Sequence, residues 1–467
     1  MIVSFRVSLV ALSVALLIAI GGAAALTVPA RATTAAVTEE APTAPNILII
    51  NTDDQRYTES LAAQPFVRSY FAGGGTEYVN GMVSTTLCCP SRTSLFSGRY
   101  SHNTGITGNG LTELVAAFDQ DATIQGYLQD AGYRTALVGK FLNTVPLSRS
   151  PQNWNRWAWF SGGYVDRYFN VDGTVRRTTG YYTQAMGNYA TSFLQSFESE
   201  DDAPWLLYLA PQAPHSGWVP EAKYASAPVP PAVHPPNWNE QDVSDKPAPV
   251  RTRAPVSEGS YESVRTQMLR TLMSVDDLVQ RVTTEMTALG EDDNTLAIYM
   301  SDNGYMWAEH RLTAKRFPYM ESVEVPFLVR WPGHVPEGVT SDRLVLQIDV
   351  LPTLLEAASV QPTLTYPLDG QSLLSADERD EVYLEYFKSP DAALGPWASV
   401  RSKTFQYTEW YYVTTGELKF REYYDLTNDP YQLVNLLGNR TTADDPDVSG
   451  LHDRLTAYRT CTGPSCP

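Results

Sequence analysis

Two adjacent cysteines stand in the run Leu87-Cys88-Cys89-Pro90-Ser91-Arg92. Proline suits the first turn of a helix, so Pro90 predicts that Cys88 lies just ahead of a helix N-terminus. Backbone N–H groups and the helix dipole favour an anion there, and Arg92, one turn inside, adds a permanent positive charge. A free cysteine is otherwise usually a small buried hydrophobe. The local residues therefore leave two roles open for Cys88, a reactive thiol and a packed side chain.

Polar residues follow four apolar runs, each close to the point where the run stops. The four runs are Ile47–Ile50, Thr135–Val138, Trp205–Leu209 and Leu296–Met300. The polar residues that follow them, in the same order, include Asp53 with Asp54, Lys140, His215, and Asp302 with Asn303. Near-continuous apolar runs are typical of parallel strands covered on both faces, and ligands of such sheets bind outside the carboxyl ends of the strands. We therefore expect these acids, the lysine and the histidine to meet at one edge of a sheet.

Helical segments separate the expected strands. Between Val264 and Leu289 apolar residues recur at spacings of three or four, which predicts one long helix with an apolar stripe. A second helix is expected around Ile124–Ala131, ending at Gly132. The alternation of strands and helices is typical of α/β folds. The expected fold class is therefore α/β, with a large, mostly parallel sheet sandwiched by helices.

The pattern changes beyond about Pro362. Residues Ser399–Tyr412 and Glu417–Asp425 alternate and are rich in aromatic side chains, which predicts a short antiparallel sheet. We expect a smaller C-terminal α+β unit at 361–467. It follows a main domain at 45–360 that carries a proline-rich surface insertion at 225–255.

Composition limits the class of protein. The chain has 467 residues, with 34 Lys and Arg against 52 Asp and Glu, and a formal net charge of −18. A nucleic-acid-binding protein presents a basic face, so this balance argues against a nucleic-acid partner. Hydrophobic residues make up 43% and charged residues 18%, which excludes general disorder.

The N-terminus carries the pattern of an export signal. Arg6 is followed by the apolar run 7–26 and by small-residue sites that end at Ala32. Residues 1–32 are therefore expected to be a cleaved signal peptide, and 33–44 a linker. An uncleaved membrane anchor is the alternative, because the run approaches the length of a membrane span. Cleavage implies a secreted or extracytoplasmic protein without stable membrane association.

Four cysteines occur in the chain, in two pairs. Cys461 and Cys466 are five residues apart, and in an oxidising compartment they are expected to form a small-loop disulfide. Cys88 and Cys89 are neighbours, and neighbouring residues pair poorly because disulfide geometry is demanding. An exported protein with two unpaired cysteines needs another explanation for them.

The run from Cys88 to Arg92, with Leu95 and Gly98, resembles the signature C-x-P-S-R-x-x-L-x-T-G of the sulfatase family, with Ser97 in place of the usual Thr. The resemblance implies the fold of the alkaline-phosphatase-like superfamily. It also implies that a separate formylglycine-generating enzyme oxidises Cys88 to Cα-formylglycine, whose hydrated aldehyde is the nucleophile.

The same resemblance implies a divalent-metal site. Asp53, Asp54, Asp302 and Asn303 match the family's metal ligands, which an oxygen of the formylglycine from Cys88 completes. A carboxylate-rich, all-oxygen set selects Ca²⁺ or Mg²⁺ over zinc. Taken alone, Asp-Asp and Ser-Asp-Asn-Gly are more often turns or caps, but their joint position around the cysteine motif favours the metal site.

Lys140, His215 and Lys315 match the family's sulfate-binding and proton-transfer positions. With Arg92 they form a catalytic set of positive groups. Such groups stabilise the negative charge that grows on the sulfate oxygens and on the leaving alkoxide. His215 or Lys315 is the expected proton donor to the departing alcohol.

One position departs from the family pattern. Many sulfatases place a histidine two residues after the position of Lys140, where this chain has Leu142. His102 and His310 are the candidates for the missing substrate contact. Four aromatic residues could either stack on sugar rings or pack in the core: Trp218, Trp238, Tyr305 and Trp307.

The segments that most resemble the N-acetylglucosamine-6-sulfatase branch are Cys88–Arg92, Gly139–Asn143, Ser301–Tyr305 and Asp429–Leu436. The implied function is hydrolysis of sulfate esters on sulfated glycans. Two alternatives remain open. One is a phosphate or phosphonate ester hydrolase on the same scaffold, and the other is a sulfated-glycan-binding protein in which Cys88 is never converted.

Overall fold

Four apolar strands lie side by side in the middle of the main sheet. They are β1 (Asn46–Thr52), β3 (Arg134–Lys140), β7 (Trp205–Ala210) and β8 (Thr295–Ser301), in the spatial order β8-β1-β7-β3. All four run parallel, with Ile47 opposite Leu206 and Thr52 opposite Ser301. The four strands predicted from the apolar runs are confirmed, and their carboxyl ends lie at one edge of the sheet.

The computed structural model describes residues 44–200, 203–387 and 395–467. The predicted signal peptide, 1–32, and all of the predicted linker except Ala44 lie outside these ranges. None of the helices within the described ranges is both long and apolar enough to cross a membrane.

The main sheet has ten strands, in the order β12-β2-β11-β8-β1-β7-β3-β4-β5-β6. Its remaining strands are β2 (Thr76–Met82), β4 (Arg156–Phe160), β5 (Tyr168–Val171), β6 (Thr174–Arg177), β11 (Phe327–Arg330) and β12 (Val339–Leu346). Pairing is parallel from β8 to β4 and between β12 and β2. It is antiparallel where β11, β5 and β6 meet their neighbours. The predicted large sheet is confirmed, and its longest run of parallel strands, from β8 to β4, lies in the middle.

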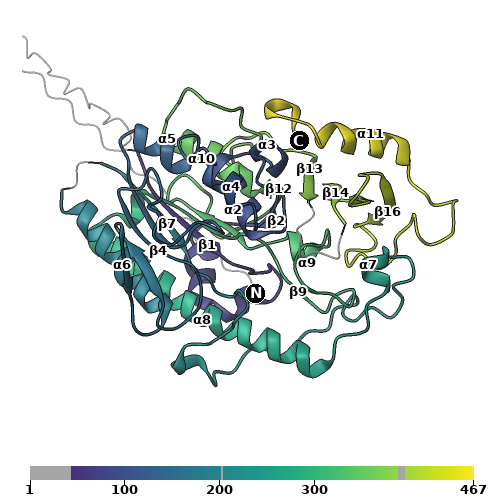
Figure 1. The fold of residues 1–467 in the computed structure, drawn as a ribbon, viewed down its shortest axis with the longest axis horizontal. Coiled ribbons are helices and arrows are strands. Elements are labelled where there is room, and N and C mark those ends of the chain that lie inside the picture. The colour runs from purple at the N-terminus through teal and green to yellow at the C-terminus, as the bar shows by residue number, and fades with distance from the viewer. Residues whose placement is uncertain (1–43, 201–202, 388–394) are drawn as a thin grey trace, which may run out of the picture. The chain divides into compact units, whose positions relative to one another are not determined.

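Helices cover both faces of the main sheet (Figure 1). The α-helices are α1 (Pro65–Val67), α2 (Cys88–Ser97), α3 (Ser101–Thr104), α4 (Thr112–Ala116), α5 (Ile124–Asp130), α6 (Tyr182–Glu198), α7 (Ala248–Arg251), α8 (Glu258–Leu289), α9 (Met320–Val323), α10 (Val350–Ala357) and α11 (Val448–Tyr458). Two of them, α5 and α8, confirm the helices predicted from the sequence.

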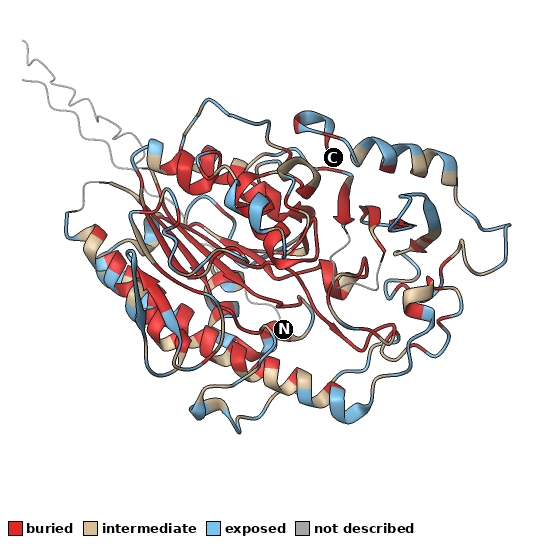
Figure 2. Ribbon diagram, in the orientation of Figure 1, coloured by how far each residue is buried: buried red, intermediate tan, exposed pale blue. Residues whose placement is uncertain are grey.

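Strand β1 contributes side chains to the core on both faces of the sheet. In β1, Leu48 and Ile50 pack with α6 and α8, whereas Ile47 and Ile49 pack with α2, α5 and α10. Successive side chains of a strand point to opposite faces of the sheet, so a continuous apolar strand is what two covered faces require. Figure 2 shows these strands buried, together with much of the helix surface that packs on them.

A second, antiparallel sheet lies in the C-terminal part of the chain. Its strands are β13 (Glu381–Tyr386), β14 (Trp397–Ser402), β15 (Phe405–Tyr411) and β16 (Leu418–Asp425), in this order. The predicted short antiparallel sheet is confirmed, and β13 adds a strand that the sequence did not indicate. Cys461 and Cys466 form the expected disulfide, whereas Cys88 and Cys89 are free.

The proline-rich segment 225–255 contains the short helix α7 and otherwise no regular helix or strand. It does not lie wholly on the surface, because Glu240 and Lys246 are buried. Nζ of Lys246 donates hydrogen bonds to the carbonyls of Gln432 (2.9 Å) and Leu433 (2.7 Å). The expectation of a surface insertion is therefore wrong for this part of the segment. Composition alone could not indicate a lysine whose partners are carbonyls far along the chain.

Gly139, which precedes Lys140 in β3, is expected to be intolerant of a side chain. Its φ is +113°, and a Cβ would lie 2.2 Å from the carbonyl oxygen of Ala210. Gly139→Ala should lower the free energy of unfolding by about 3 kcal/mol or more, because it adds both backbone strain and a clash with a backbone atom. Urea unfolding followed by circular dichroism measures this loss.

Gly132→Ala is the matched control for this substitution. Gly132 also has a positive φ, +92°, but nothing lies within 4 Å of its Cβ position. We expect it to cost only about 1 kcal/mol. Equal losses in the two variants would contradict the clash at Gly139.

Candidate active site

The polar residues at the ends of the four central strands meet in one place. They are Asp53 and Asp54 after β1, Lys140 at the end of β3, His215 after β7, and Asp302 and Asn303 after β8. Hydrogen bonds from backbone amides join two of these strand ends. The Asp302 amide donates to the Thr52 carbonyl at 3.0 Å, and the Asp54 amide donates to Oδ1 of Asp302 at 3.2 Å. The predicted convergence at the sheet edge is therefore confirmed.

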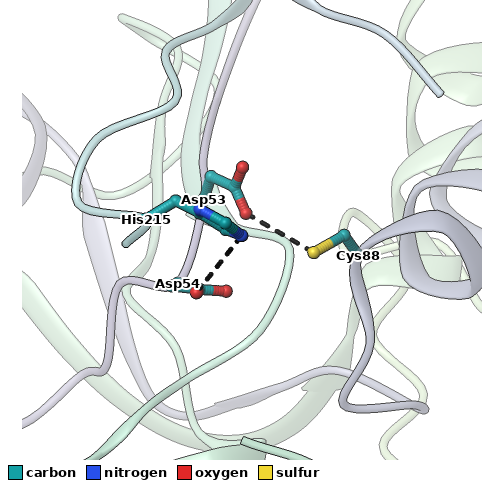
Figure 3. Close-up of side chains that lie close together, drawn as sticks. All are labelled: Asp53, Asp54, Cys88 and His215. Carbon is teal, nitrogen blue, oxygen red and sulfur yellow. Dashed lines mark hydrogen bonds and ion pairs between the residues drawn. The ribbon is translucent and has the colours of Figure 1, made fainter. Parts of the chain in front are cut away.

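Cys88 lies opposite these strand ends, at the start of α2 (Figure 3). Cys88 is the first residue of the helix, whereas the sequence predicted it to lie just before the helix. The helix therefore begins one residue earlier than predicted. Cys88 is only 1% exposed. Its sulfur lies 3.6 Å from Oδ1 of Asp53 and 2.7 Å from Nζ of Lys315. Figure 3 shows that Asp53, Asp54 and His215 gather on the side of Cys88 that carries the sulfur.

Three carboxylates are buried in the site, and each is paired with its own cation. The pairs are Asp53 with Lys140, Asp54 with Lys315, and Asp302 with Arg92. Burial alone would raise the pKa of Asp53, but Lys140 and His215 lower it to about 2. Burial also works against ionisation of Asp54, and Lys315 lowers the pKa of Asp54 below its usual value. Both carboxyl groups are therefore negative at neutral pH.

Arg92 is fully buried and binds more than its carboxylate partner. Its Nε donates to Oδ2 of Asp302 at 2.8 Å, and its Nη1 donates to the Lys140 carbonyl (3.2 Å) and to the Tyr208 hydroxyl (3.3 Å). Its Nη2 is buried and has no hydrogen-bond partner among the described residues. The Tyr208 hydroxyl also accepts from Nδ2 of Asn51 at 2.8 Å. Sequence reasoning missed Tyr208, because it lies within a strand whose pattern indicates only core packing.

His215 is the most exposed side chain of the site, at 32%. Its Nε2 lies 3.9 Å from Oδ2 of Asp54. Asp53 raises the pKa of His215 against the opposing effect of burial, to about 9. The imidazole is therefore protonated at neutral pH, on the side of the site that solvent reaches.

The ammonium group of Lys315 has two oxygen partners besides the Cys88 sulfur. It contacts Oδ1 of Asp54 and lies 3.3 Å from Oδ1 of Asn303, whose Nδ2 donates to Asp54 at 2.7 Å. One possible ligand atom from each of four side chains lies within 4.8 Å of the others: Asp53, Asp54, Cys88 and His215. Hard carboxylate and amide oxygens that already attract a cation fit a divalent ion such as Ca²⁺ or Mg²⁺.

His102 and His310 do not replace the missing family histidine. Nδ1 of His102 lies 2.9 Å from Oε2 of Glu385, and its Nε2 lies 3.0 Å from the Cys461 carbonyl. His310 is fully buried, with its Nδ1 2.6 Å from Oε2 of Glu240. Both rings are held by partners outside the site, so the expectation of a substrate contact is wrong for both. Those partners are far away in the sequence, and no local pattern could reveal them.

The aromatic candidates divide into buried and partly exposed residues. Trp307 is 3% exposed and Tyr305 is 8% exposed. Nε1 of Trp307 donates to the sulfur of Met268 in α8 at 3.0 Å. Trp307 therefore packs in the core, whereas Trp218 and Trp238 remain partly exposed.

Two family models match the chain. Residues 45–360 match the Sulfatase model, and residues 308–460 match the model of the N-sulphoglucosamine sulphohydrolase C-terminal region. The first match covers more than half of the chain. The chain therefore belongs to the sulfatase family, a family of sulfuric ester hydrolases.

Two relatives and one solved structure illustrate the likeness. The extracellular sulfatase SULF-1 homolog of Drosophila melanogaster is 33% identical over 350 residues, which cover 71% of this chain but only 31% of that protein. N-acetylglucosamine-6-sulfatase of Homo sapiens is 28% identical over 482 residues, covering 90% of this chain and 86% of that protein. A protein solved in complex with its substrate D-glucosamine-2-N,6-O-disulfate has a TM-score of 0.73 at 24% identity, over 89% of this chain and 96% of that one. This last likeness shows the fold.

The Arg92–Asp302 pair is expected to be essential for stability. Arg92→Met would leave Asp302 as a buried carboxylate without its cation, which should lower the free energy of unfolding by about 3–5 kcal/mol. Arg177→Met is the control, because Arg177 pairs with Asp166 where both side chains are exposed, 55% and 42%. An exposed pair contributes about 0–1 kcal/mol. Urea unfolding in the presence of EDTA compares the two variants, and a loss below about 1 kcal/mol for Arg92→Met would contradict the argument.

Proposed function

We propose that the protein is an exported sulfatase that hydrolyses sulfate esters on sulfated glycans, using a formylglycine made from Cys88 and a divalent cation. The observation that carries the proposal is the position of Cys88 at the start of α2. Its sulfur lies 2.7 Å from Nζ of Lys315 and 3.6 Å from a carboxylate oxygen of Asp53. A cysteine that serves only packing would have apolar neighbours, whereas this one faces paired charges.

Residue 88 is the proposed site of an oxygen nucleophile. A formylglycine at this position would carry two hydroxyls once its aldehyde is hydrated. One would serve as the nucleophile toward sulfur, and deprotonation of the other would allow sulfate to be released. The Lys315 ammonium and the N-terminus of α2 both favour a negative charge at this position. These two features would therefore stabilise the deprotonated form of the nucleophile.

The cations of the site have distinct tasks in this proposal. Lys140 and Lys315 stabilise the negative charge on the sulfate oxygens, and Arg92 holds the end of the Lys140 strand through its carbonyl. His215 donates a proton to the departing alcohol. Its partial exposure suits contact with a substrate that enters from solvent.

The metal ligands in this proposal are Asp53, Asp54, Asp302 and Asn303, with an oxygen of residue 88. A bound Ca²⁺ or Mg²⁺ would polarise a sulfate oxygen and offset the charge of the carboxylates. The donors favour both ions, because all are hard oxygen atoms. We propose Ca²⁺ as the resident ion, with Mg²⁺ as the alternative.

The proposed substrate is a glycan that carries a group like N-acetylglucosamine-6-sulfate. The support is the likeness to N-acetylglucosamine-6-sulfatase of Homo sapiens over 90% of this chain. Secretion follows in this proposal from the signal-like residues 1–32, and maturation requires a formylglycine-generating enzyme as partner. The proposed domain boundaries, 45–360 and 361–467, rest on the change of sequence pattern beyond about Pro362.

Conversion of Cys88 is the first prediction of this proposal. Protein secreted by its native host should yield a peptide with the mass of formylglycine at position 88, and it should hydrolyse an aryl sulfate and 6-O-sulfated N-acetylglucosamine. Cys88→Ala should lower kcat by at least about a thousandfold, because it removes the nucleophile.

Cys89→Ala is the matched control. Cys89 is fully buried in the core, and burial raises the pKa of its thiol to about 12, so it carries no reactive thiolate at neutral pH. We expect its kcat to stay within about threefold of the wild type. Two results together would favour the binding-protein alternative. They are an intact thiol at position 88 of the secreted protein, and binding of sulfated glycan that is unchanged in Cys88→Ala. Faster turnover of an aryl phosphonate than of an aryl sulfate would contradict the proposed substrate class.

Metal binding gives a second prediction. Addition of Ca²⁺ to EDTA-treated protein should raise Tm by about 3 °C or more at an ion concentration about 100-fold above the dissociation constant. Asp54→Asn should remove most of this shift, whereas Asp166→Asn, at an exposed ion pair, should leave it unchanged. Differential scanning calorimetry with Ca²⁺ and Mg²⁺ measures the shifts. A larger shift with Mg²⁺ would reverse the choice of ion, and no shift with either would contradict the metal site.

A further inference from the structure

Lys315 is carried by a short hairpin rather than by a strand of the main sheet. The hairpin consists of β9 (Met306–Trp307) and β10 (Thr313–Ala314), paired antiparallel with Ala314 opposite Met306. Lys315 follows directly after β10. Its contact with Cys88 therefore depends on the conformation of residues 306–316.

This hairpin has an unusual backbone. Five of its non-glycine residues have positive φ: Ala308 (+89°), His310 (+49°), Arg311 (+61°), Ala314 (+72°) and Arg316 (+89°). Two of them flank Lys315 directly. Such conformations are uncommon for non-glycine residues, and they persist only where the surrounding structure holds them. The contacts that hold the hairpin are therefore also contacts that place Lys315.

The proline-rich segment 225–255 supplies several of these contacts. The Asn239 amide donates to the Ala308 carbonyl at 2.9 Å, and the His310 amide donates to the Asn237 carbonyl at 2.8 Å. Nε of Arg311 donates to the Glu240 carbonyl at 2.8 Å. Three hydrogen bonds from the neighbouring segment thus hold the loop between β9 and β10.

A buried histidine–carboxylate pair lies at the centre of this contact. His310 is 0% exposed and Glu240 is 5% exposed, and Nδ1 of His310 lies 2.6 Å from Oε2 of Glu240. Nε2 of His310 faces the donor Nδ2 of Asn237 at 3.5 Å, so Nδ1 is the nitrogen that carries the proton. Burial and Lys246 lower the pKa of His310 to about 4, which keeps the ring neutral. The ring also packs on Tyr319, with centroids 4.3 Å apart.

We propose that His310 and Glu240 are positioning residues for the sulfatase reaction. Their buried hydrogen bond holds the strained hairpin, and the hairpin holds the Lys315 ammonium against Cys88 and Asp54. The proline-rich segment 225–255 then acts as a brace for the active site, which here means that it holds the hairpin that carries Lys315. This inference rests on the role proposed above for Lys315.

Kinetics of the converted enzyme test the first part of the inference. His310→Ala should lower kcat about tenfold or more with KM within about threefold, because a displacement of about 1 Å is enough to cost that much. His310→Asn should recover most of kcat, since its amide N–H can donate from a position near that of Nδ1. His102→Ala is the matched control, because it breaks a partly buried histidine–carboxylate pair with Glu385 that has no hydrogen bond to the hairpin among the described residues. A loss of kcat in His102→Ala as large as in His310→Ala would overturn the inference.

A double-mutant cycle separates positioning from general damage. In a Lys315→Ala background, His310→Ala should lower kcat by less than about twofold more, because the group that it positions is already gone. A full tenfold effect in that background would show that His310 acts by another route, and it would overturn the inference.

Hydrogen exchange tests the brace without any turnover. Peptides that cover residues 306–316 should exchange faster in His310→Ala and Glu240→Leu than in the wild type or in His102→Ala. If the wild type hydrolyses no sulfate ester, the proposed function fails while this readout still decides whether the brace exists. Unchanged exchange across residues 306–316 would overturn it.

Discussion

Charge balance in a buried site is the constraint on which the rest of the structure depends. Three carboxylates lie almost out of contact with solvent, and each has a cation from another segment of the chain. A buried ion is stable only when its partner and its remaining hydrogen bonds are in place. Asp54 and Lys315 are 261 residues apart in sequence, so these pairs exist only when the whole domain is folded. The site therefore forms only together with the complete fold of the domain.

The order of the central strands meets this constraint. Because β8, β1, β7 and β3 are neighbours and parallel, their carboxyl ends deliver acids, a lysine and a histidine to one edge. The interiors of these strands are apolar on both faces and are covered by helices, which fixes the strand ends that carry the ion pairs. Helix α2 then faces this edge with Cys88 at its N-terminus, where the helix dipole favours a negative nucleophile. Sheet and helix thus contribute different parts of one electrostatic arrangement.

The sequence predicts those parts of the site that depend on local patterns. It does not predict contacts between residues that are far apart in the chain. Apolar runs that stop at Asp53, Lys140 and Asp302 are local patterns, and they predict the strands and their shared edge correctly. The cysteine motif likewise predicts a helix start within one residue. Partners chosen by packing leave no such pattern. Tyr208 looks like any core residue of a strand, and His310 looks like a candidate for a substrate contact until its buried contact with Glu240 is seen.

Lys315 shows why the remaining parts of the chain matter to a site at the sheet edge. The other ionic side chains come from strand ends or from α2, which packing makes rigid, but Lys315 comes from a hairpin with a strained backbone. The proline-rich segment fixes one side of this hairpin through Asn237 and Glu240. The C-terminal sheet fixes the other, since Nε1 of Trp397 donates to the Arg316 carbonyl at 2.9 Å. Among the described residues, no side-chain hydrogen bond joins Cys88 to either element, yet both constrain the ammonium group 2.7 Å from its sulfur. The insertion and the C-terminal sheet are thus structural conditions for the charge arrangement of the site, and variation in either is tolerable only where it does not reach the hairpin.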